Sequence, residues 1–203
     1  MVFMFTYHAA VSQHSTTKPT YVTLSGGHVA FGTGVAGGFG VGLEVSRNII
    51  DKPSPFVAQL LVGGELFFES GVSAPVTQNP PLNGFFFKSF DHHNHALLWL
   101  KAAYYPFQQK IVRGLHLQIG PTLGYKQRTT EREAYLVSLG GGEFQRRSVL
   151  RYDNGAYAGY RISVGYELPV ATKCTAGVRA DFSNNTRGDI NTLLGVKFGY
   201  RLN

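Results

Sequence analysis

The stretch Thr192-Leu-Leu-Gly-Val-Lys-Phe-Gly-Tyr-Arg-Leu202 decides the fold class of this chain. Its even-numbered positions from Leu194 onward are apolar or aromatic, whereas the odd-numbered positions after Leu193 are Gly, Lys, Gly and Arg. Successive side chains of a β-strand point to opposite faces, so a strand here has one apolar face and one face of charged and small residues. The stretch 158–168 repeats this arrangement, with apolar or aromatic residues at even positions and Gly, Arg, Ser, Gly and Glu at odd ones.

The character of the two faces indicates which one meets solvent. In a soluble sandwich or a calycin-type barrel, the aliphatic face is buried and the charged face is exposed to water. Here the charged face is rich in glycine, as expected where side chains must fit inside a narrow closed barrel. The apolar face carries aromatic residues towards its ends, as lipid-facing strands do at membrane interfaces. The pattern favours a membrane barrel, with the soluble barrel as its competitor.

The same alternation can be followed through eight runs, which predict strands at 20–31, 35–48, 56–69, 96–105, 111–126, 155–168, 174–182 and 191–202. We therefore predict an all-β chain that forms an eight-stranded antiparallel up-and-down transmembrane β-barrel. Pro121 lies within one predicted strand and cannot donate a ladder hydrogen bond. We expect a bulge or a locally lost hydrogen bond there.

The lengths of the connections support the same architecture independently. The connections 51–55, 106–110 and 169–173 are short, whereas the segments 70–95 and 128–154 are long. With an even number of strands, both termini lie on the side of the short turns. Short turns on one side and longer loops on the other are typical of outer-membrane barrels.

Composition excludes several other classes of protein. No stretch approaches the roughly 20 apolar residues that a membrane-spanning helix needs. The single cysteine, Cys174, cannot form an internal disulfide. The net charge is +7, but the basic residues are spread over lumen positions and two loops, which does not favour nucleic-acid binding. No cofactor is expected.

The chain is expected to contain one domain. Residues 1–12 resemble the end of a secretory signal peptide, because Met1 to Tyr7 is apolar and Ala10-Val-Ser12 supplies small residues before a cleavage site. Its basic region is missing, and a merely apolar N-terminus is the alternative. The barrel domain would then cover residues 13–203.

The end of the chain resembles the small outer-membrane β-barrel proteins of Gram-negative bacteria, of the OmpA-like and OmpX-like class. Gly195-Val-Lys-Phe198-Gly-Tyr200 is similar to the glycine-x-x-aromatic-x-aromatic signal by which the barrel-insertion machinery recognises such proteins. The chain departs from that pattern at Leu193 and in ending Leu202-Asn203. The resemblance implies residence in the bacterial outer membrane, contact with its lipids and lipopolysaccharide, and a monomer, but architecture alone gives no function.

Charged residues gather on the predicted lumen face. They are Glu44, Glu65, Lys101, Arg161, Glu167, Arg179, Asp181, Lys197 and Arg201. An eight-stranded barrel is just wide enough for side chains to fill it, and buried charges are costly unless paired. We expect a salt-bridge network that plugs the lumen, with a narrow porin-like path as the alternative.

Two motifs raise the question of catalysis or metal binding. Asp181-Phe-Ser183-Asn184 resembles the histidine-x-serine-asparagine segment of outer-membrane lipid A deacylases, but Asp181 replaces the histidine and leaves Ser183 without an obvious base. We expect no catalytic residue and keep deacylation as an alternative function. His92, His93 and His95 follow Asp91 in the first long segment. Neighbours in a flexible loop rarely fix a coordination geometry, so we expect no metal site.

The second long segment predicts a hairpin that extends two strands above the membrane around Gly140-Gly141-Gly142. Its five arginines, Arg128, Arg132, Arg146, Arg147 and Arg151, are candidates for binding the phosphates of lipopolysaccharide. The alternative is a solvated loop in which Glu131, Glu133 and Glu143 are their partners. On this basis we expect a structural or surface-binding protein whose specificity lies in the long loops.

Overall fold

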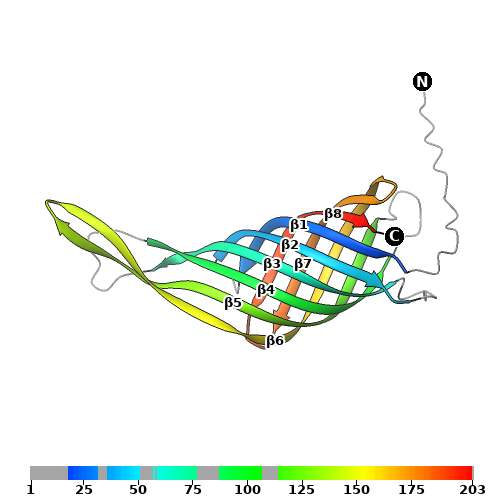
Figure 1. Cartoon of the computed structure of the whole chain (residues 1–203), viewed down its shortest axis with the longest axis horizontal. Helices are drawn as coiled ribbons and strands as arrows, with labels where there is room; N and C mark the ends of the chain where they lie inside the picture. Colours follow the sequence, from blue (N-terminus) through cyan, green and yellow to red (C-terminus); the bar gives the residue numbers. More distant parts are fainter. Residues whose placement is uncertain are drawn as a thin grey trace, which may run out of the picture.

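The chain folds into one closed antiparallel barrel of eight strands, in which each strand pairs with its neighbour in sequence and β1 pairs with β8 (Figure 1). The computed structural model describes residues 18–31, 36–50, 57, 59–76, 87–106 and 114–202. The strands are β1 (Thr20–Phe31), β2 (Ala36–Asn48), β3 (Gln59–Val76), β4 (Phe87–Tyr104), β5 (Leu115–Gly140), β6 (Glu143–Ala171), β7 (Cys174–Asn185) and β8 (Ile190–Arg201). The predicted fold class is confirmed. Within these residues no helix is long and apolar enough to cross a membrane.

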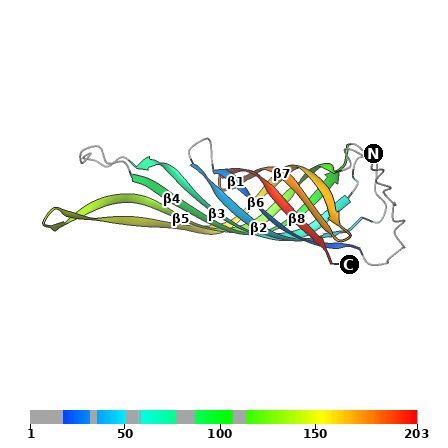
Figure 2. The same ribbon diagram turned by 90° about the horizontal axis from the view of Figure 1, so that it is seen from above.

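Strands β3 to β6 are longer than predicted, and β7 also runs beyond its predicted end at 182, to Asn185. Strands β1, β2, β7 and β8 have 12 or 13 residues each. β5 has 26 residues and β6 has 29. The predicted hairpin above the barrel is confirmed: β5 and β6 project well beyond the other strands (Figures 1 and 2). Its turn contains Gly140, Gly141 and Gly142, with φ of 90°, 63° and 87°. This left-handed backbone is readily adopted by glycine and explains the three consecutive glycines.

The opposite end of the barrel carries a short connection and the end of β8. β6 and β7 are joined by the turn at Thr172-Lys173. The amide of Arg201 donates to the carbonyl of Lys173 at 2.8 Å, and the amide of Leu202 donates to the carbonyl of Thr20 at 2.9 Å. The predicted short turn at 51–55, all of the predicted turn 106–110 except Pro106, and the predicted signal remnant 1–12 lie outside the described residues.

A belt of exposed apolar side chains surrounds the barrel. Leu98, Leu123 and Leu194 are 68 %, 63 % and 67 % exposed. Other members of the belt are Leu24, Val41, Leu43, Val45, Val62, Leu66, Leu100, Leu117, Ile119, Val164, Val178, Val196 and Phe198. Exposed aromatic side chains mark both edges, with Phe39, Phe68, Tyr125 and Tyr160 towards the hairpin and Tyr104 and Tyr200 towards the termini. This is the exterior of a membrane barrel.

The belt has a clear upper edge on β3, β4 and β5. The outward-facing residues become polar at Ser70, Asn94 and Gln127, all of which are exposed. Asn94 lies opposite Gln127 of β5 and opposite Phe68 of β3, so the change occurs at the same ladder position on β4 and β5 and one outward-facing residue later on β3. Buried apolar side chains such as Phe67, Leu97 and Trp99 face the bore, together with many buried polar residues, as the predicted faces require. The polar residues include Ser25, Ser46, Glu65, Lys101, His116, Thr122, Arg161, Ser163, Arg179 and Lys197.

Pro121 causes a local loss of pairing but no bulge. The ladder between β4 and β5 stops after Trp99 and resumes at Ala102 in the same register. The register between β5 and β6 runs past Pro121 without a shift. A Cβ atom at Gly120 would lie 1.8 Å from the carbonyl oxygen of Leu100, so the two strands approach closely beside the proline. The predicted loss of a hydrogen bond is confirmed, and the alternative of a bulge is wrong.

The belt yields a first prediction. Val196→Arg places a charge on the outer face near the middle of β8 and should lower the free energy of unfolding in lipid bilayers by about 2–4 kcal/mol. Leu139→Arg, at the tip of the hairpin, changes an equally exposed side chain (58 % against 50 %) beyond the belt and should have little effect. Denaturant titration of both variants in lipid vesicles measures the difference. Equal effects would contradict a lipid-facing belt.

Candidate functional site

Glu65 is the centre of an ion-pair network in the middle of the lumen. Its side chain is fully buried and comes from β3. Arg161 of β6 donates to its Oε2, and Arg179 of β7 donates to its Oε1 at 3.2 Å. Alternation along each strand turns these side chains inward. Barrel closure brings Glu65 next to Arg161, which lies 96 positions later in the sequence, and next to Arg179, which lies 114 positions later. One carboxylate therefore accepts from two guanidinium groups inside the barrel.

The network continues to both sides of Arg179. Its Nη2 lies 3.0 Å from Asp181, and its Nη1 lies 3.9 Å from Glu44. Glu44 in turn accepts from the Nζ of Lys101 at 3.2 Å. Lys101 is also held over the ring of Trp99, with Nζ 3.9 Å from the ring centroid. Six of the nine predicted lumen residues thus form one connected group: Glu44, Glu65, Lys101, Arg161, Arg179 and Asp181.

Two further predicted residues form a second pair nearer the termini. Lys197 forms an ion pair with Glu167, and its Nζ lies 3.1 Å from the Nε2 of His116. His116 is buried and was not among the nine predicted lumen residues. Arg201 is exposed at the end of β8 and makes no ion pair with any residue that the structure describes. The assignment of Arg201 to the network is therefore wrong, because β8 ends there at the mouth of the barrel.

The open space in the lumen is divided. The cavity nearer the termini has a volume of about 240 Å³ and is lined by residues including Tyr21, Gln59 and His116. Beyond the Glu65 pairs, two cavities of about 30 and 20 Å³ are lined in part by Phe67, Glu69 and Arg161. Each of these two small cavities can hold about one water molecule.

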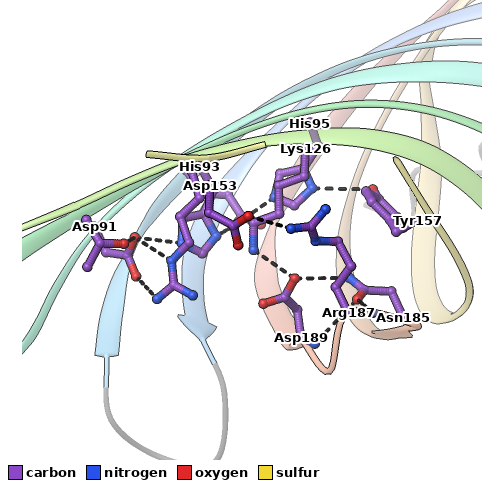
Figure 3. A network of polar contacts seen from close by, with 12 residues as sticks. Asp91, His93, His95, Lys126, Asp153, Tyr157, Asn185, Arg187 and Asp189 are labelled. Carbon is purple, nitrogen blue, oxygen red and sulfur yellow. Dashed lines mark hydrogen bonds and ion pairs between the residues drawn. The ribbon is translucent and has the colours of Figure 1, made fainter. Parts of the chain in front are cut away.

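A second polar cluster lies at the upper edge of the belt (Figure 3). Asp91 of β4 accepts hydrogen bonds from Arg128, at 3.1 and 2.6 Å, and from the hydroxyl of Thr130 at 2.9 Å. The Nε2 of His93 lies 2.8 Å from the same carboxylate. Burial alone would raise the pKa of Asp91, but the hydrogen bonds from His93 and Arg128 outweigh burial and hold the pKa well below its usual range. Asp91 is therefore an ionised anchor of this cluster.

His93 and His95 point into the lumen beside Glu69 of β3, whereas His92 is exposed on the outer face. The Oε2 of Glu69 lies 3.4 Å from the Nδ1 of His93 and 3.5 Å from the Nε2 of His95. The prediction that these histidines lie in a flexible loop is wrong, because β4 begins at Phe87 and includes them. The alternate spacing of Asp91, His93 and His95 is the sequence signal that would have placed all three on one strand face.

On the other side of this cluster, Lys126 forms an ion pair with Asp189 at 2.9 Å. Burial would raise the pKa of Asp189, but the hydrogen bond from Lys126 outweighs it and the pKa is lowered. Arg187 pairs with Asp153, which ties the turn between β7 and β8 to β6 (Figure 3). These contacts were not predicted, since they depend on how the loops meet.

The five hairpin arginines are divided between paired and exposed positions. Arg128 is bound to Asp91, and Arg146 donates to Glu131 at 2.6 Å. Arg147 and Arg151 are exposed on β6 and make no ion pair with any described residue. The side chain of Arg132 lies outside the described residues.

The deacylase-like segment lies on β7 with Asp181 and Ser183 at inward-facing positions. Asp181 is buried and paired with Arg179, and Ser183 lines the small lumen cavities beside Arg161. Phe182, between them, belongs to the outer face. A serine that attacks a membrane lipid has to reach the lipid face, and Ser183 does not.

No model of a protein family and no curated protein matches the chain. Among solved structures, Neisserial surface protein A is similar over 89 % of this chain and 96 % of its own, with 12 % identity and a TM-score of 0.48. Ail, the attachment invasion locus protein of Yersinia pestis, is similar over 91 % and 97 %, with 8 % identity and a TM-score of 0.42. The N-terminal β-barrel domain of Pseudomonas aeruginosa OprF is similar over 92 % and 100 %, with 12 % identity and a TM-score of 0.33.

The architecture of the chain itself gives its location. A bilayer offers no partners for exposed backbone groups, so only helices and closed barrels cross it. This barrel has no open edge, an apolar belt outside with aromatic side chains at both edges, and charged side chains inside. A long hairpin on one side and a two-residue turn on the other complete the pattern of bacterial outer-membrane barrels. The chain is an outer-membrane β-barrel protein.

The Glu65 network yields a second prediction. Arg179→Ala removes a buried partner from Glu65 and Asp181 and should lower the free energy of unfolding by about 3–5 kcal/mol, because it leaves buried carboxylate charge uncompensated. Arg201→Ala is the matched control and should change it by no more than about 0.5 kcal/mol, since Arg201 is exposed. Denaturant unfolding in lipid vesicles compares the two variants. A similar small effect of both would mean that the lumen pairs contribute no stability.

Proposed function

We propose that this protein is a non-enzymatic outer-membrane barrel whose lumen is closed by ion pairs and whose surface-binding function resides in the strands that project above the membrane. The observation that carries the proposal is the unequal length of the strands. Four of the eight strands, β1, β2, β7 and β8, have 12 or 13 residues each, whereas β5 and β6 continue into a paired hairpin beyond the belt. Binding residues concentrate on loops that a rigid scaffold holds in place.

The geometry of the lumen supports closure. Glu65, Arg161 and Arg179 come from three different strands and meet across the bore, with side-chain exposures of 0 %, 10 % and 7 %. The cavities on the two sides of this group are separate, and the upper ones hold about one water molecule each. An ion would have to displace a guanidinium group from a buried carboxylate in order to pass.

Closure predicts that the wild-type protein gives no steady conductance in planar lipid bilayers. The double variant Glu65→Ala/Arg161→Ala removes both members of one pair without leaving either charge alone. It should show discrete openings, because Arg179 can then turn fully to Asp181 and the bore gains two side-chain volumes. Steady, ion-selective conductance of the wild-type protein would contradict closure.

The binding surface that we propose lies on the hairpin, and its ligand is phosphate on the lipopolysaccharide of the outer leaflet. Arg147 and Arg151 are four residues apart on β6, so both side chains belong to the same strand face. Both are exposed. Guanidinium groups bind phosphate through two parallel hydrogen bonds. Arg128 and Arg146 are already held by carboxylates, so they position the hairpin rather than bind a ligand.

The arginines yield a further prediction. Arg147→Gln/Arg151→Gln should weaken binding of the detergent-folded protein to bisphosphorylated lipid A by about tenfold or more, since each lost charged hydrogen bond contributes about 1.5–3 kcal/mol. Arg201→Gln, at the opposite end of the barrel, should bind like the wild type. Calorimetric titration with lipid A and with its dephosphorylated form measures both effects. Equal affinity for lipid A and its dephosphorylated form, or unchanged affinity in the double variant, would contradict phosphate binding by the hairpin.

The inward position of Ser183 favours this proposal over a lipid A deacylase. Asp181 cannot serve as a base for Ser183 while it is paired with Arg179 at 3.0 Å. Activation of a serine hydroxyl needs a base within hydrogen-bond reach and a substrate beside it. Ser183 has neither a free base nor access to a membrane lipid, because Asp181 is paired with Arg179 and Ser183 faces the lumen.

A further inference from the structure

Three buried side chains at the upper end of the lumen present metal-binding atoms to one another. Glu69 comes from β3, and His93 and His95 come from β4, directly across the ladder. One carboxylate oxygen of Glu69 and one ring nitrogen of each histidine all lie within 4.8 Å of one another. All three residues are buried. Because alternate residues of a strand share a face, the side chains of His93 and His95 both point into the lumen from β4.

Two of the three separations match those of ligands around a tetrahedral ion. Bonds of about 2.0–2.1 Å to nitrogen and oxygen place tetrahedral ligands about 3.3–3.4 Å apart. The Oε2 of Glu69 lies 3.4 Å from the Nδ1 of His93 and 3.5 Å from the Nε2 of His95. Both distances exceed the roughly 2.7–2.9 Å of a charge-assisted hydrogen bond. At these distances the carboxylate of Glu69 can share one ion with both histidines.

Each histidine also has a partner at its other ring nitrogen. The Nε2 of His93 lies 2.8 Å from Asp91, and the Nδ1 of His95 lies 3.3 Å from the hydroxyl of Tyr157. Metal-bound histidines almost always use the second nitrogen in this way, and such partners fix the ring orientation and tautomer. Asp91 is itself anchored by Arg128. The surroundings thus hold both rings with the proposed ligand atoms directed towards Glu69.

The position of the cluster provides an open coordination site and compatible charge. Glu69 and His95 line a cavity of about 30 Å³, which is enough for one water molecule as a fourth ligand. Lys126, which lies opposite His95 in the ladder between β4 and β5, forms an ion pair with Asp189 at 2.9 Å. Two imidazoles and a carboxylate are the donor set that suits zinc in a site with an open position.

We propose that Glu69, His93 and His95 bind one Zn²⁺ ion at the upper end of the lumen, with Asp91 and Tyr157 as positioning residues. The ion would link β3 to β4 at the point where these strands leave the membrane. This site is independent of the proposed surface binding, since it lies inside the barrel and uses none of the exposed arginines.

Titration of the metal-stripped, detergent-folded full chain with Zn²⁺ tests the proposal. The wild type should bind one Zn²⁺ per chain by calorimetry and by elemental analysis. Glu69→Gln and His95→Gln should each weaken binding by about 100-fold or more. Tyr157→Phe, which keeps all three ligands, should weaken it by about tenfold. Co²⁺ in place of Zn²⁺ should give the visible absorption of a tetrahedral ion in the wild type and lose it in Glu69→Gln.

His92→Gln is the matched control, because His92 lies on the same strand but points outward. It should bind Zn²⁺ like the wild type. The circular dichroism spectrum and heat-modifiable electrophoretic mobility establish that each variant is folded before its affinity is compared. Three results would overturn the proposal: no stoichiometric Zn²⁺ in the wild type, unchanged affinity in Glu69→Gln and His95→Gln, or loss of binding in His92→Gln.

Discussion

The rest of this structure depends on the requirement that every backbone polar group within a bilayer be hydrogen-bonded by the protein itself. Sheet pairing that closes β8 onto β1 meets this requirement and leaves no free edge. Closure then fixes everything inside the barrel, because alternate side chains of each strand have to share a narrow bore. Charged residues are tolerated there only as partners of one another. The buried group around Glu65 is therefore a consequence of closing a small barrel with a polar interior.

The same constraint explains why the upper half of the molecule differs from the lower half. Above the belt, water can reach the backbone, so strands need not be closed into a barrel, and β5 and β6 continue as a hairpin with exposed edges. The polar cluster around Asp91 lies where these two regimes meet. There, Arg128 of β5 and His93 of β4 share one carboxylate, which ties the base of the hairpin to the mouth of the barrel.

The amino-acid pattern predicted the barrel and the direction of its side chains, but it did not predict the contacts between distant residues. Alternation was sufficient to place Val41 and Leu98 outside and Lys101 inside, because the lipid imposes opposite character on the two faces. Alternation disappears above the belt, where both faces are polar. The stretch with His92 and Asn94 outside and its neighbours inside therefore resembled a loop, although backbone pairing continues through it.

The ion-pair partners of the lumen residues could not be predicted from the sequence for a different reason. The contact of Glu65 with Arg161 and Arg179 depends on the register of three strands around a closed ring, and a shift of one residue in any of them would turn a side chain outward. Composition correctly indicated that lumen charges must pair, yet it could not exclude Arg201, whose place depends on where β8 ends.

Glu69 illustrates the same limit. It is an ordinary lumen carboxylate in sequence, and only its register against His93 brings it to a spacing that suits a metal ion. Register is thus the physical quantity that converts a predictable set of inward-facing residues into a specific site.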